Sequence, residues 1–406
     1  MERIDLMDPD VFVSGVPHDY FTWLRAHDPV AWHDEKDGTG YWLIARFDDV
    51  VEVNRDWRRY SNWLRASSLE DPVSEEELRV RRLVFVNQDP KQHTRTRKLV
   101  RGAFTPRRLQ QLTGQIEAIC ADLVDDLLAA DEVDFVHDIS RHLPFRMVAR
   151  MFGVPEADWD MVLPWVEQVT NNQEPAHNPG LSSRFEVQRK ALEYGHELIA
   201  RARRDGGDGI LAELLDARIE REDGTFDQLS DDEIASFILV VVIGGVETTS
   251  HTVAEAIGLF ADRPDLYDRL TAAGECPPSL VEELVRWGSP AMNFRRTATE
   301  DHELGGRTIK AGDKVVMSFS SANRDERHFA DPHTFDPWRT PNDHIGFGGG
   351  GPHFCVGAQL ARLDVRLMLN EILRRVTRFE RTGEPQRLRS NAFAGWLRLP
   401  VTATGR

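Results

Sequence analysis

Cysteine is scarce in this chain, whose 406 residues include only Cys120, Cys276 and Cys355. An odd number of widely spaced cysteines excludes a disulfide framework and a zinc site built from paired cysteines. The thiols are therefore expected to stay reduced, which favours a cytoplasmic protein. The question that this scarcity raises is whether one of the three cysteines carries chemistry.

Long apolar runs and positive charge are also lacking. The longest strongly apolar run, 237–246, is shorter than the roughly 18 to 20 residues that span a bilayer, so no membrane span is expected. The first ten residues lack the basic start and apolar stretch of a secretory signal. With 67 acidic and 50 basic residues, the net charge is −17, which argues against nucleic acid as a partner because phosphate binding needs a positive field.

What is present is an ordinary globular composition, with 41% hydrophobic and 29% charged residues. Length alone suggests two or three domains, but the chain has no repeat and no Pro- or Ser-rich linker, so we expect a single domain over 1–406. Periodicity predicts a mainly α fold with small β-sheets. The predicted helices are 109–128, 184–204, 230–261 and 356–375, the β-leaning runs are 30–33, 41–46 and 303–317, and 170–183 is predicted to be a long loop of the kind that forms lids.

The predicted helix 230–261 has the character of an interior helix. Ser230 and Glu233 have capping-box spacing, and the helix is apolar nearly all round from 234 to 243. Gly244 and Gly245 then interrupt it, at a cost of up to about 1 kcal/mol each relative to alanine. Two such glycines need a structural reason, and one that the sequence allows is a close crossing of two helices. The hydroxyl of Thr248 is placed to bond back to the Gly244 carbonyl.

A second unusual segment, Phe347–Gly357, reads FGGGGPHFCVG and places Cys355 just before a predicted helix. The positive end of a helix dipole and free backbone N–H groups stabilise a thiolate, which makes Cys355 a candidate metal ligand. The four consecutive glycines permit close approach of a flat ligand. The alternative is a glycine-rich turn around a buried free cysteine.

This segment resembles the haem-binding loop of the cytochromes P450, in which a cysteine thiolate is the axial iron ligand. The family usually has an aromatic residue seven positions before the cysteine, whereas Gly348 stands there and Phe347 comes one position earlier. The resemblance implies that Cys355 ligates the iron of haem b. It also implies a cytochrome P450 fold that holds haem between the interior helix and this loop. The further loop residues implied to contact haem are Phe347, Gly351 and Gly357.

Three other motifs follow the family order along the chain. The resemblance implies that Glu247 and Thr248 are the acid and alcohol that supply protons when dioxygen is activated, beside Gly244 on the haem face of the helix. It implies cationic partners for the haem propionates, each of which taken singly is more often a surface charge: His93, Arg97, Arg296 and His353. Arg295 is the less favoured twin of Arg296. It also implies a structural network of Glu283, Arg286 and Arg339, although Glu and Arg three apart also pair on ordinary solvated helices.

The implied activity is monooxygenation, with one oxygen atom of dioxygen inserted into an apolar steroid, terpenoid, fatty acyl compound or other natural product. Because the haem fold uses the whole length, electrons are expected from a separate ferredoxin and its reductase. The basic residues considered for that partner are Arg97, Lys98, Arg101, Arg362 and Arg366. The implied pocket residues are Leu239, Val242, Met292, Asn293, Phe294 and Phe393. The alternatives are a tailoring enzyme of secondary metabolism, driven by peroxide or acting on a carrier-bound substrate, and a non-catalytic haem sensor.

Overall fold

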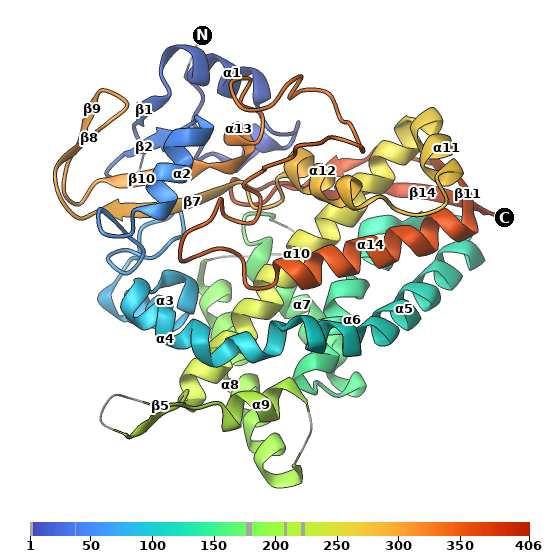
Figure 1. The fold of residues 1–406 in the computed structure, drawn as a ribbon, viewed down its shortest axis with the longest axis horizontal. Coiled ribbons are helices and arrows are strands. Elements are labelled where there is room, and N and C mark those ends of the chain that lie inside the picture. Colours follow the sequence, from blue (N-terminus) through green and yellow to red (C-terminus); the bar gives the residue numbers. More distant parts are fainter. Residues whose placement is uncertain (1–2, 37, 176–180, 207–208, 221–223) are drawn as a thin grey trace. The chain divides into compact units, whose positions relative to one another are not determined.

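The computed structural model describes residues 3–36, 38–175, 181–206, 209–220 and 224–406 (Figure 1). The chain divides into two compact units. The first unit comprises Met1–Thr94, Pro277–Cys355 and Arg387–Gly395, and the second comprises Arg95–Cys276, Val356–Gln386 and Trp396–Arg406. Helices dominate and the sheets are small, which confirms the predicted fold class.

The first unit is built on a five-stranded sheet with the order β1-β2-β10-β7-β3. Its strands are β1 (Val30–His33), β2 (Tyr41–Ile44), β10 (Lys314–Ser318), β7 (Asn293–Ala298) and β3 (Tyr60–Ser61). Neighbouring strands are antiparallel except for β2 and β10, which are parallel. The predicted β-leaning runs 30–33 and 41–46 thus contain β1 and β2, and the end of the run 303–317 lies in β10.

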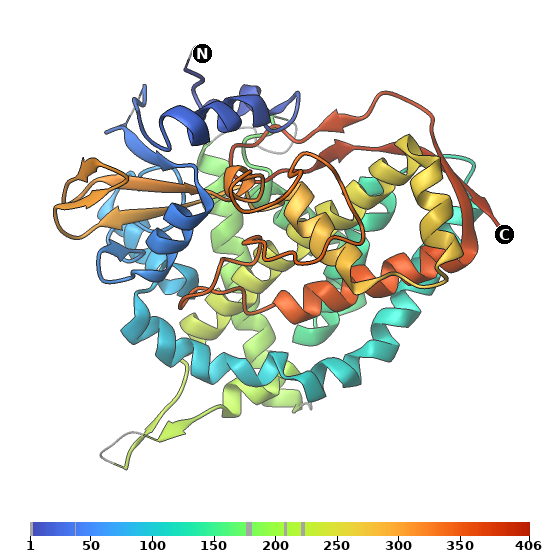
Figure 2. The same cartoon turned by 45° about the horizontal axis from the view of Figure 1, so that its top comes forward.

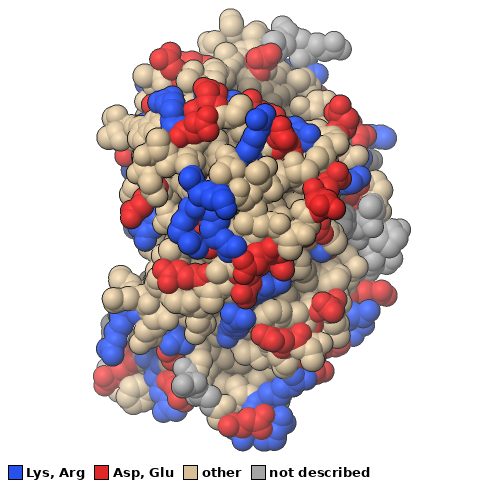
Figure 3. Space-filling model, turned by 90° about the vertical axis from the view of Figure 1, so that its right-hand side faces the viewer, with Lys and Arg blue, Asp and Glu red and all other residues tan. Residues whose placement is uncertain are grey.

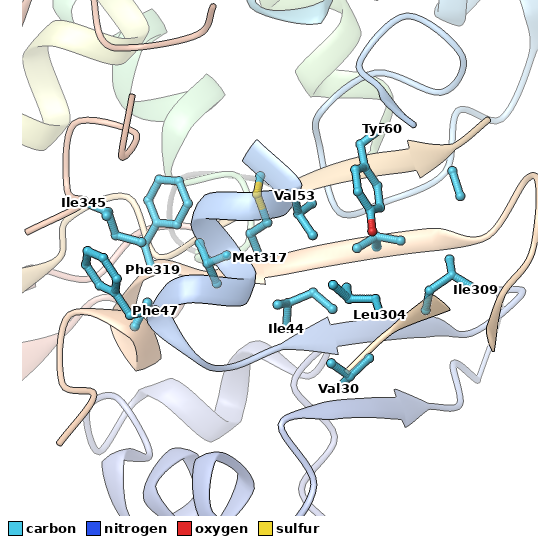
Figure 4. Packing of buried hydrophobic residues seen from close by; sticks show 14 of the residues in the cluster. Val30, Ile44, Phe47, Val53, Tyr60, Leu304, Ile309, Met317, Phe319 and Ile345 are labelled. Atoms are coloured by element: carbon cyan, nitrogen blue, oxygen red, sulfur yellow. The ribbon is translucent and has the colours of Figure 1, made fainter. Parts of the chain in front are cut away.

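Helix α2 (Phe47–Arg55) packs on this sheet through apolar residues spaced three apart. Phe47 and Val53 of α2 join Ile44, Met317 and Ile345 in one buried cluster (Figure 4). This packing fixes the last turn of α2. The remaining elements of the first unit are η1 (Pro9–Phe12), α1 (His18–His27), α3 (Glu75–Leu83), η2 (Phe85–Asn87), α12 (Pro278–Gly288), β8 (His302–Leu304), β9 (Arg307–Ile309) and α13 (Phe319–Ala322).

The second unit is organised around α10 (Asp231–Asp262), the predicted interior helix (Figures 1 and 2). Ser230 and Glu233 form the predicted capping box at its start. The helices with the most extensive contacts to α10 include α6 (His142–Phe152), α7 (Trp159–Thr170), α8 (Leu181–Asp205) and α14 (Ala358–Arg375). By length and composition alone α10 is apolar enough to cross a membrane, but 56% of its most apolar stretch is buried inside the protein, as in a core helix.

The other elements of the second unit complete its helical layers and carry a small sheet. Helix α4 (Pro90–Val100) begins in the first unit and continues into the second. The others are η3 (Arg101–Phe104), α5 (Pro106–Ala129), η4 (Phe135–Ser140), η5 (Glu156–Asp158), α9 (Ile210–Asp216), α11 (Pro264–Ala272), the sheet β11 (Val376–Arg381), β14 (Pro400–Gly405) and β4 (Val133–Asp134), and the short strands β5 (Ile219–Glu220), β6 (Phe226–Asp227) and β13 (Trp396–Arg398). Strand β12 (Gln386–Arg387) has one residue in each unit. The predicted helices 109–128 and 356–375 correspond to α5 and α14. Helix α8 begins at 181 and not at 184, and part of the predicted loop, 176–180, lies outside the described residues.

The predicted network around Glu283 is present within the first unit. Glu283 and Arg286 are both fully buried, and Arg286 donates from Nε and Nη2 to the two carboxylate oxygens at 2.7 Å each. Arg339 donates from Nε to Glu283 Oε2 at 3.1 Å. These residues therefore hold segments together and belong to the structural scaffold.

Arg286→Met is expected to lower the free energy of unfolding by about 3 kcal/mol, because it leaves a buried carboxylate without its bidentate partner. Urea unfolding checks this value. The matched control is Arg374→Ala. The Arg374 side chain is 68% exposed and pairs with Glu371 at i,i+3 spacing. The control should change stability by less than about 1 kcal/mol. Equal, small losses in both variants would contradict a buried structural network.

Candidate functional site

The loop before Cys355 has a backbone that only glycine adopts readily. Gly348, Gly349, Gly350 and Gly351 have φ values of +101°, +54°, +90° and +79°. The loop is closed by backbone hydrogen bonds, from Gly348 N–H to Ile345 O at 2.7 Å and from Cys355 N–H to Phe347 O at 2.9 Å. The positive φ values therefore explain why glycine stands at all four positions.

Cys355 differs from the other two cysteines in its surroundings. Cys355 is exposed, so the alternative of a turn around a buried cysteine is wrong. Cys120 and Cys276 are buried. Burial raises the pKa of Cys276 to about 12 and raises that of Cys120 further. Since the thiolate is the form that binds a metal, Cys355 is the metal-ligand candidate among the three.

A buried cation lies in the same unit. Arg296 is 4% exposed and donates to Asn54 Oδ1 at 2.7 Å and to Arg295 O at 2.9 Å. Burial lowers the pKa of Arg296 to about 10, against the opposing charge of Asp89. Both hydrogen-bond acceptors are neutral, whereas the neighbouring Arg295 is paired with Asp71 at 2.7 Å. Arg296 thus has the donor chemistry that a cofactor carboxylate requires, and Arg295 is already paired.

Two histidines of the first unit lie close to each other. His93 of α4 is buried, and its ring centroid lies 4.3 Å from that of His353 in the cysteine loop. Arg97 lies one turn after His93 on α4 and is half-buried. The donors of this set suit the propionates of haem b. Gly351 approaches α2 so closely that a Cβ there would lie 3.0 Å from Asn54 O, and Gly357 is the N-cap of α14.

In the second unit, the middle of α10 is open although most of the rest of the helix is buried. Residues 239–245 are half-buried or exposed, and Gly244 is exposed. A Cβ built on Gly244 meets no described atom within 4 Å, and one on Gly245 meets only Val148 at 3.9 Å. A close helix crossing therefore does not explain Gly244, and the alternative that we gave for it is wrong. Leu239 and Val242 lie on the same open stretch, half-buried, as pocket residues would.

Thr248 makes the predicted bond to the preceding turn. Its Oγ1 donates to Gly244 O at 2.6 Å, and the helix continues unbroken through this turn. Thr252 makes the equivalent bond to Thr248 O at 2.8 Å. The Thr248 hydroxyl is thus held beside the open stretch of α10.

Glu247 is 5% exposed and is held by two residues that the sequence pattern did not identify. Thr170, at the end of α7, donates to Glu247 Oε1 at 3.1 Å, and His251 Nε2 lies 3.2 Å from Oε2. Burial, and next the charge of Glu167, raise the pKa of Glu247 to about 7, while Thr170 and Arg141 act in the opposite direction. Near neutral pH, Glu247 therefore exists in both protonation states, as a group that passes protons must. The sequence signal that could have identified His251 is its position four residues after Glu247, which places both residues on the same face of the helix.

The raised pKa of Glu247 predicts how the stability of the protein depends on pH. The folded pKa of about 7 exceeds the ordinary value of 4.5, so the native state binds the proton more tightly than the unfolded state. Stability from this group is present at low pH and is lost as the pH rises toward and past 7. Glu247→Gln should therefore be about 3 kcal/mol more stable than wild type near pH 8, with little advantage near pH 4. Urea unfolding at both pH values tests this, and a pH-independent difference would contradict it.

The predicted pocket residues of the first unit divide into two kinds. Met292 is 1% exposed inside a core cluster with Leu43 and Val316, so it is a packing residue. Asn293, Phe294 and Phe393 are half-buried, and a β-bridge between residues 291 and 393 brings their segments together. Asn293 Nδ2 donates to Asn391 O at 2.8 Å, which leaves Asn293 Oδ1 buried without a partner among the described residues.

The basic residues considered for a redox partner lie in the second unit. Arg97, Lys98 and Arg101 lie on α4 and η3, and Arg362 and Arg366 lie on α14. Lys98, Arg101 and Arg366 are exposed and the other two are half-buried. On the face that carries the C-terminal end of α14, basic and acidic side chains alternate (Figure 3). The docking role of these residues stays a prediction.

The comparisons with known proteins agree with these features. A family model described as Cytochrome P450 matches residues 137–273 and 278–400. The chain is 35% identical over 99% of its length to a steroid C26-monooxygenase of Mycolicibacterium smegmatis, covering 94% of that protein. It is 33% identical over 99% to linalool 8-monooxygenase of Pseudomonas putida, covering 99% of it. A solved structure of a Mycobacterium marinum cytochrome P450 in complex with pseudoionone matches with a TM-score of 0.88 and 33% identity, over 99% of both chains.

Proposed function

The chain belongs to the cytochrome P450 family, and we propose that it inserts one oxygen atom of dioxygen into an apolar small molecule with electrons from a separate ferredoxin and its reductase. It is a monooxygenase whose cofactor is haem b. We also propose that the two units work as one catalytic domain over 1–406, in the cytoplasm.

One observation carries the proposal. Cys355 is an exposed thiol on a loop whose four glycines all have positive φ, while the other two cysteines are buried. A fixed, accessible thiolate is what axial ligation of a haem iron requires. Support for the cofactor comes from Arg296, a buried cation whose hydrogen-bond acceptors are neutral, together with His93 and His353. We assign these three residues, with Arg97, to the propionates.

When bound, haem with a thiolate ligand supplies the reductive activation of dioxygen. The chain's own contribution to that chemistry is proton supply. Glu247, with a pKa of about 7, gives up a proton near neutral pH, and the adjacent Thr248 hydroxyl passes it on. The bond to Gly244 O fixes the position of that hydroxyl. Two such protons, together with two electrons from the redox partner, would convert one oxygen atom to water, and the other atom would enter the substrate.

For the substrate, we propose a steroid, a terpenoid or a branched fatty acyl compound. The activities of the relatives, steroid C26-monooxygenation and linalool 8-monooxygenation, support this class. The half-buried Leu239, Val242, Phe294 and Phe393 supply apolar surface. Asn293 Oδ1 would accept a hydrogen bond from a substrate hydroxyl, because its amide nitrogen is already committed to Asn391 O. A substrate with one polar end is therefore favoured.

Ligand titration tests this proposal. Steroids, acyclic terpene alcohols and branched fatty acids are added to the ferric holoenzyme, and the low- to high-spin shift reports binding. Each binding compound is then turned over with ferredoxin, reductase and NAD(P)H, and separately with hydrogen peroxide. A hydroxylated product with the ferredoxin system supports the proposal. Product with peroxide alone would establish the peroxide-driven alternative, and neither binding nor product from any free compound would favour a carrier-bound substrate or a haem sensor.

A further inference from the structure

The last turn of α2 makes a set of contacts with the cysteine loop that the sequence did not indicate. Asn54 is 4% exposed, and its amide nitrogen donates to Gly348 O and, at 2.9 Å, to Gly350 O. Its Oδ1 accepts from Arg296 Nη2 at 2.7 Å. Both amide hydrogens and one oxygen lone pair of this buried side chain are therefore used. All of these residues lie in the first unit.

We propose that Asn54 is a positioning residue for the haem site, which couples the Arg296 guanidinium to the backbone of the cysteine loop and thereby sets the position of the Cys355 thiolate. The inference rests on the proposed role of Cys355 as the iron ligand. Asn54 lies outside the cysteine loop, and it is not one of the residues that we assign to the propionates.

The contacts hold the loop at successive carbonyl groups. Asn54 holds those of Gly348 and Gly350, and Arg55 donates from Nε to Gly349 O at 3.1 Å. A chain of positive-φ glycines has many alternative conformations, so it needs such external donors to stay in one of them. The close approach of Gly351 to Asn54 O leaves no room for a side chain between the loop and α2.

This restraint passes directly to the cysteine. Gly348 follows Phe347, whose carbonyl accepts the N–H of Cys355 at 2.9 Å. A shift of Gly348 therefore moves the acceptor that holds the Cys355 backbone. Arg296 is affected as well. When Asn54 is replaced, this buried cation loses one of its two hydrogen bonds and keeps only the one to Arg295 O.

Outer-shell partners of this kind tune a metal site as well as stabilise it. Asn54→Leu removes all three hydrogen bonds, whereas Asn54→Asp keeps an acceptor for Arg296 and loses the donors to the glycine carbonyls. The matched control is Asn62→Leu. Asn62 is 1% exposed in the same unit, and its amide donates to Val86 O at 2.7 Å, which is not part of the cysteine loop.

The experiment measures haem affinity, the reduction potential and the Soret band of the reduced carbon monoxide complex for each holoenzyme, with the melting temperature alongside. Asn54→Leu is expected to weaken haem binding about 10- to 100-fold, to shift the potential and to lose much of the red-shifted band. Asn54→Asp should show a smaller change of the same kind. Asn62→Leu should lower the melting temperature but keep the wild-type spectrum and potential.

Wild-type spectrum, potential and haem affinity in Asn54→Leu, with only a lower melting temperature, would overturn the positioning role. If that variant does not fold, Asn54→Asp decides, and a fully wild-type spectrum and potential there would likewise overturn it. A wild-type protein without the red-shifted band would instead contradict the proposed ligation by Cys355, so the two failures are distinguishable.

Discussion

Cys355→Ser is expected to abolish the red-shifted Soret band of the reduced carbon monoxide complex. The shift arises from a thiolate bound to the iron, and a serine hydroxyl does not supply the same electron donation. The substitution replaces an exposed side chain of nearly equal size, so the fold should survive. Monooxygenase turnover should be lost together with the band.

The controls for this experiment are the other two cysteines. Cys120→Ala and Cys276→Ala each change a buried thiol whose pKa is raised by burial. Both variants should keep the red-shifted band, although the lost packing should lower their stability. Retention of the band in Cys355→Ser, or its loss in Cys276→Ala with haem still bound, would contradict the assignment of Cys355.

Thr248→Ala is expected to uncouple NAD(P)H consumption from product formation. Without the hydroxyl that bonds to Gly244 O, the proposed relay fails, and dioxygen leaves as hydrogen peroxide with two electrons from the redox partner and two protons from solvent. Product formation should fall on the order of 10²-fold, the usual contribution of a proton-transfer group, while NAD(P)H is still consumed. The carbon monoxide spectrum should stay unchanged because the thiolate side is untouched. The measurement is the amount of product and of peroxide formed per NAD(P)H.

Thr252→Ala is the matched control for that prediction. Thr252 makes the same kind of back-bond one turn later, to Thr248 O at 2.8 Å, and it is buried. In Thr252→Ala, most of the electrons taken from NAD(P)H should still be used to form product. If Thr248→Ala instead stays tightly coupled, Thr248 does not relay protons and the proposed role of the pair is wrong.

The parts of the fold that were predicted correctly are those that local sequence specifies. The capping box at Ser230 and the apolar surface that follows it define α10, and the glycines at 348–351 define the cysteine loop. The bond from Thr248 to Gly244 was predictable because residues four apart on a helix always face each other. The more distant motifs were identified because they follow one another along the chain in the order found in the cytochromes P450.

The parts that were missed depend on contacts between distant segments. Asn54 lies 294 residues before Gly348, and no periodicity relates the two. Thr170 lies 77 residues before Glu247, at the end of another helix, so neither local pattern reveals their hydrogen bond. Met292 was assigned to the pocket by resemblance, together with Asn293 and Phe294, but it packs in a core cluster with Leu43 and Val316, which are far from it in the sequence.

Turnover in isotopically labelled dioxygen tests the central claim most directly. The wild-type holoenzyme is supplied with a ligand that shifts its spin state, with ferredoxin, reductase and NAD(P)H, and the product is analysed by mass spectrometry. The proposed function predicts one labelled oxygen atom per product molecule, with the second atom in water. Product oxygen that carries no label, or product that forms only when peroxide replaces the electron donors, would contradict it.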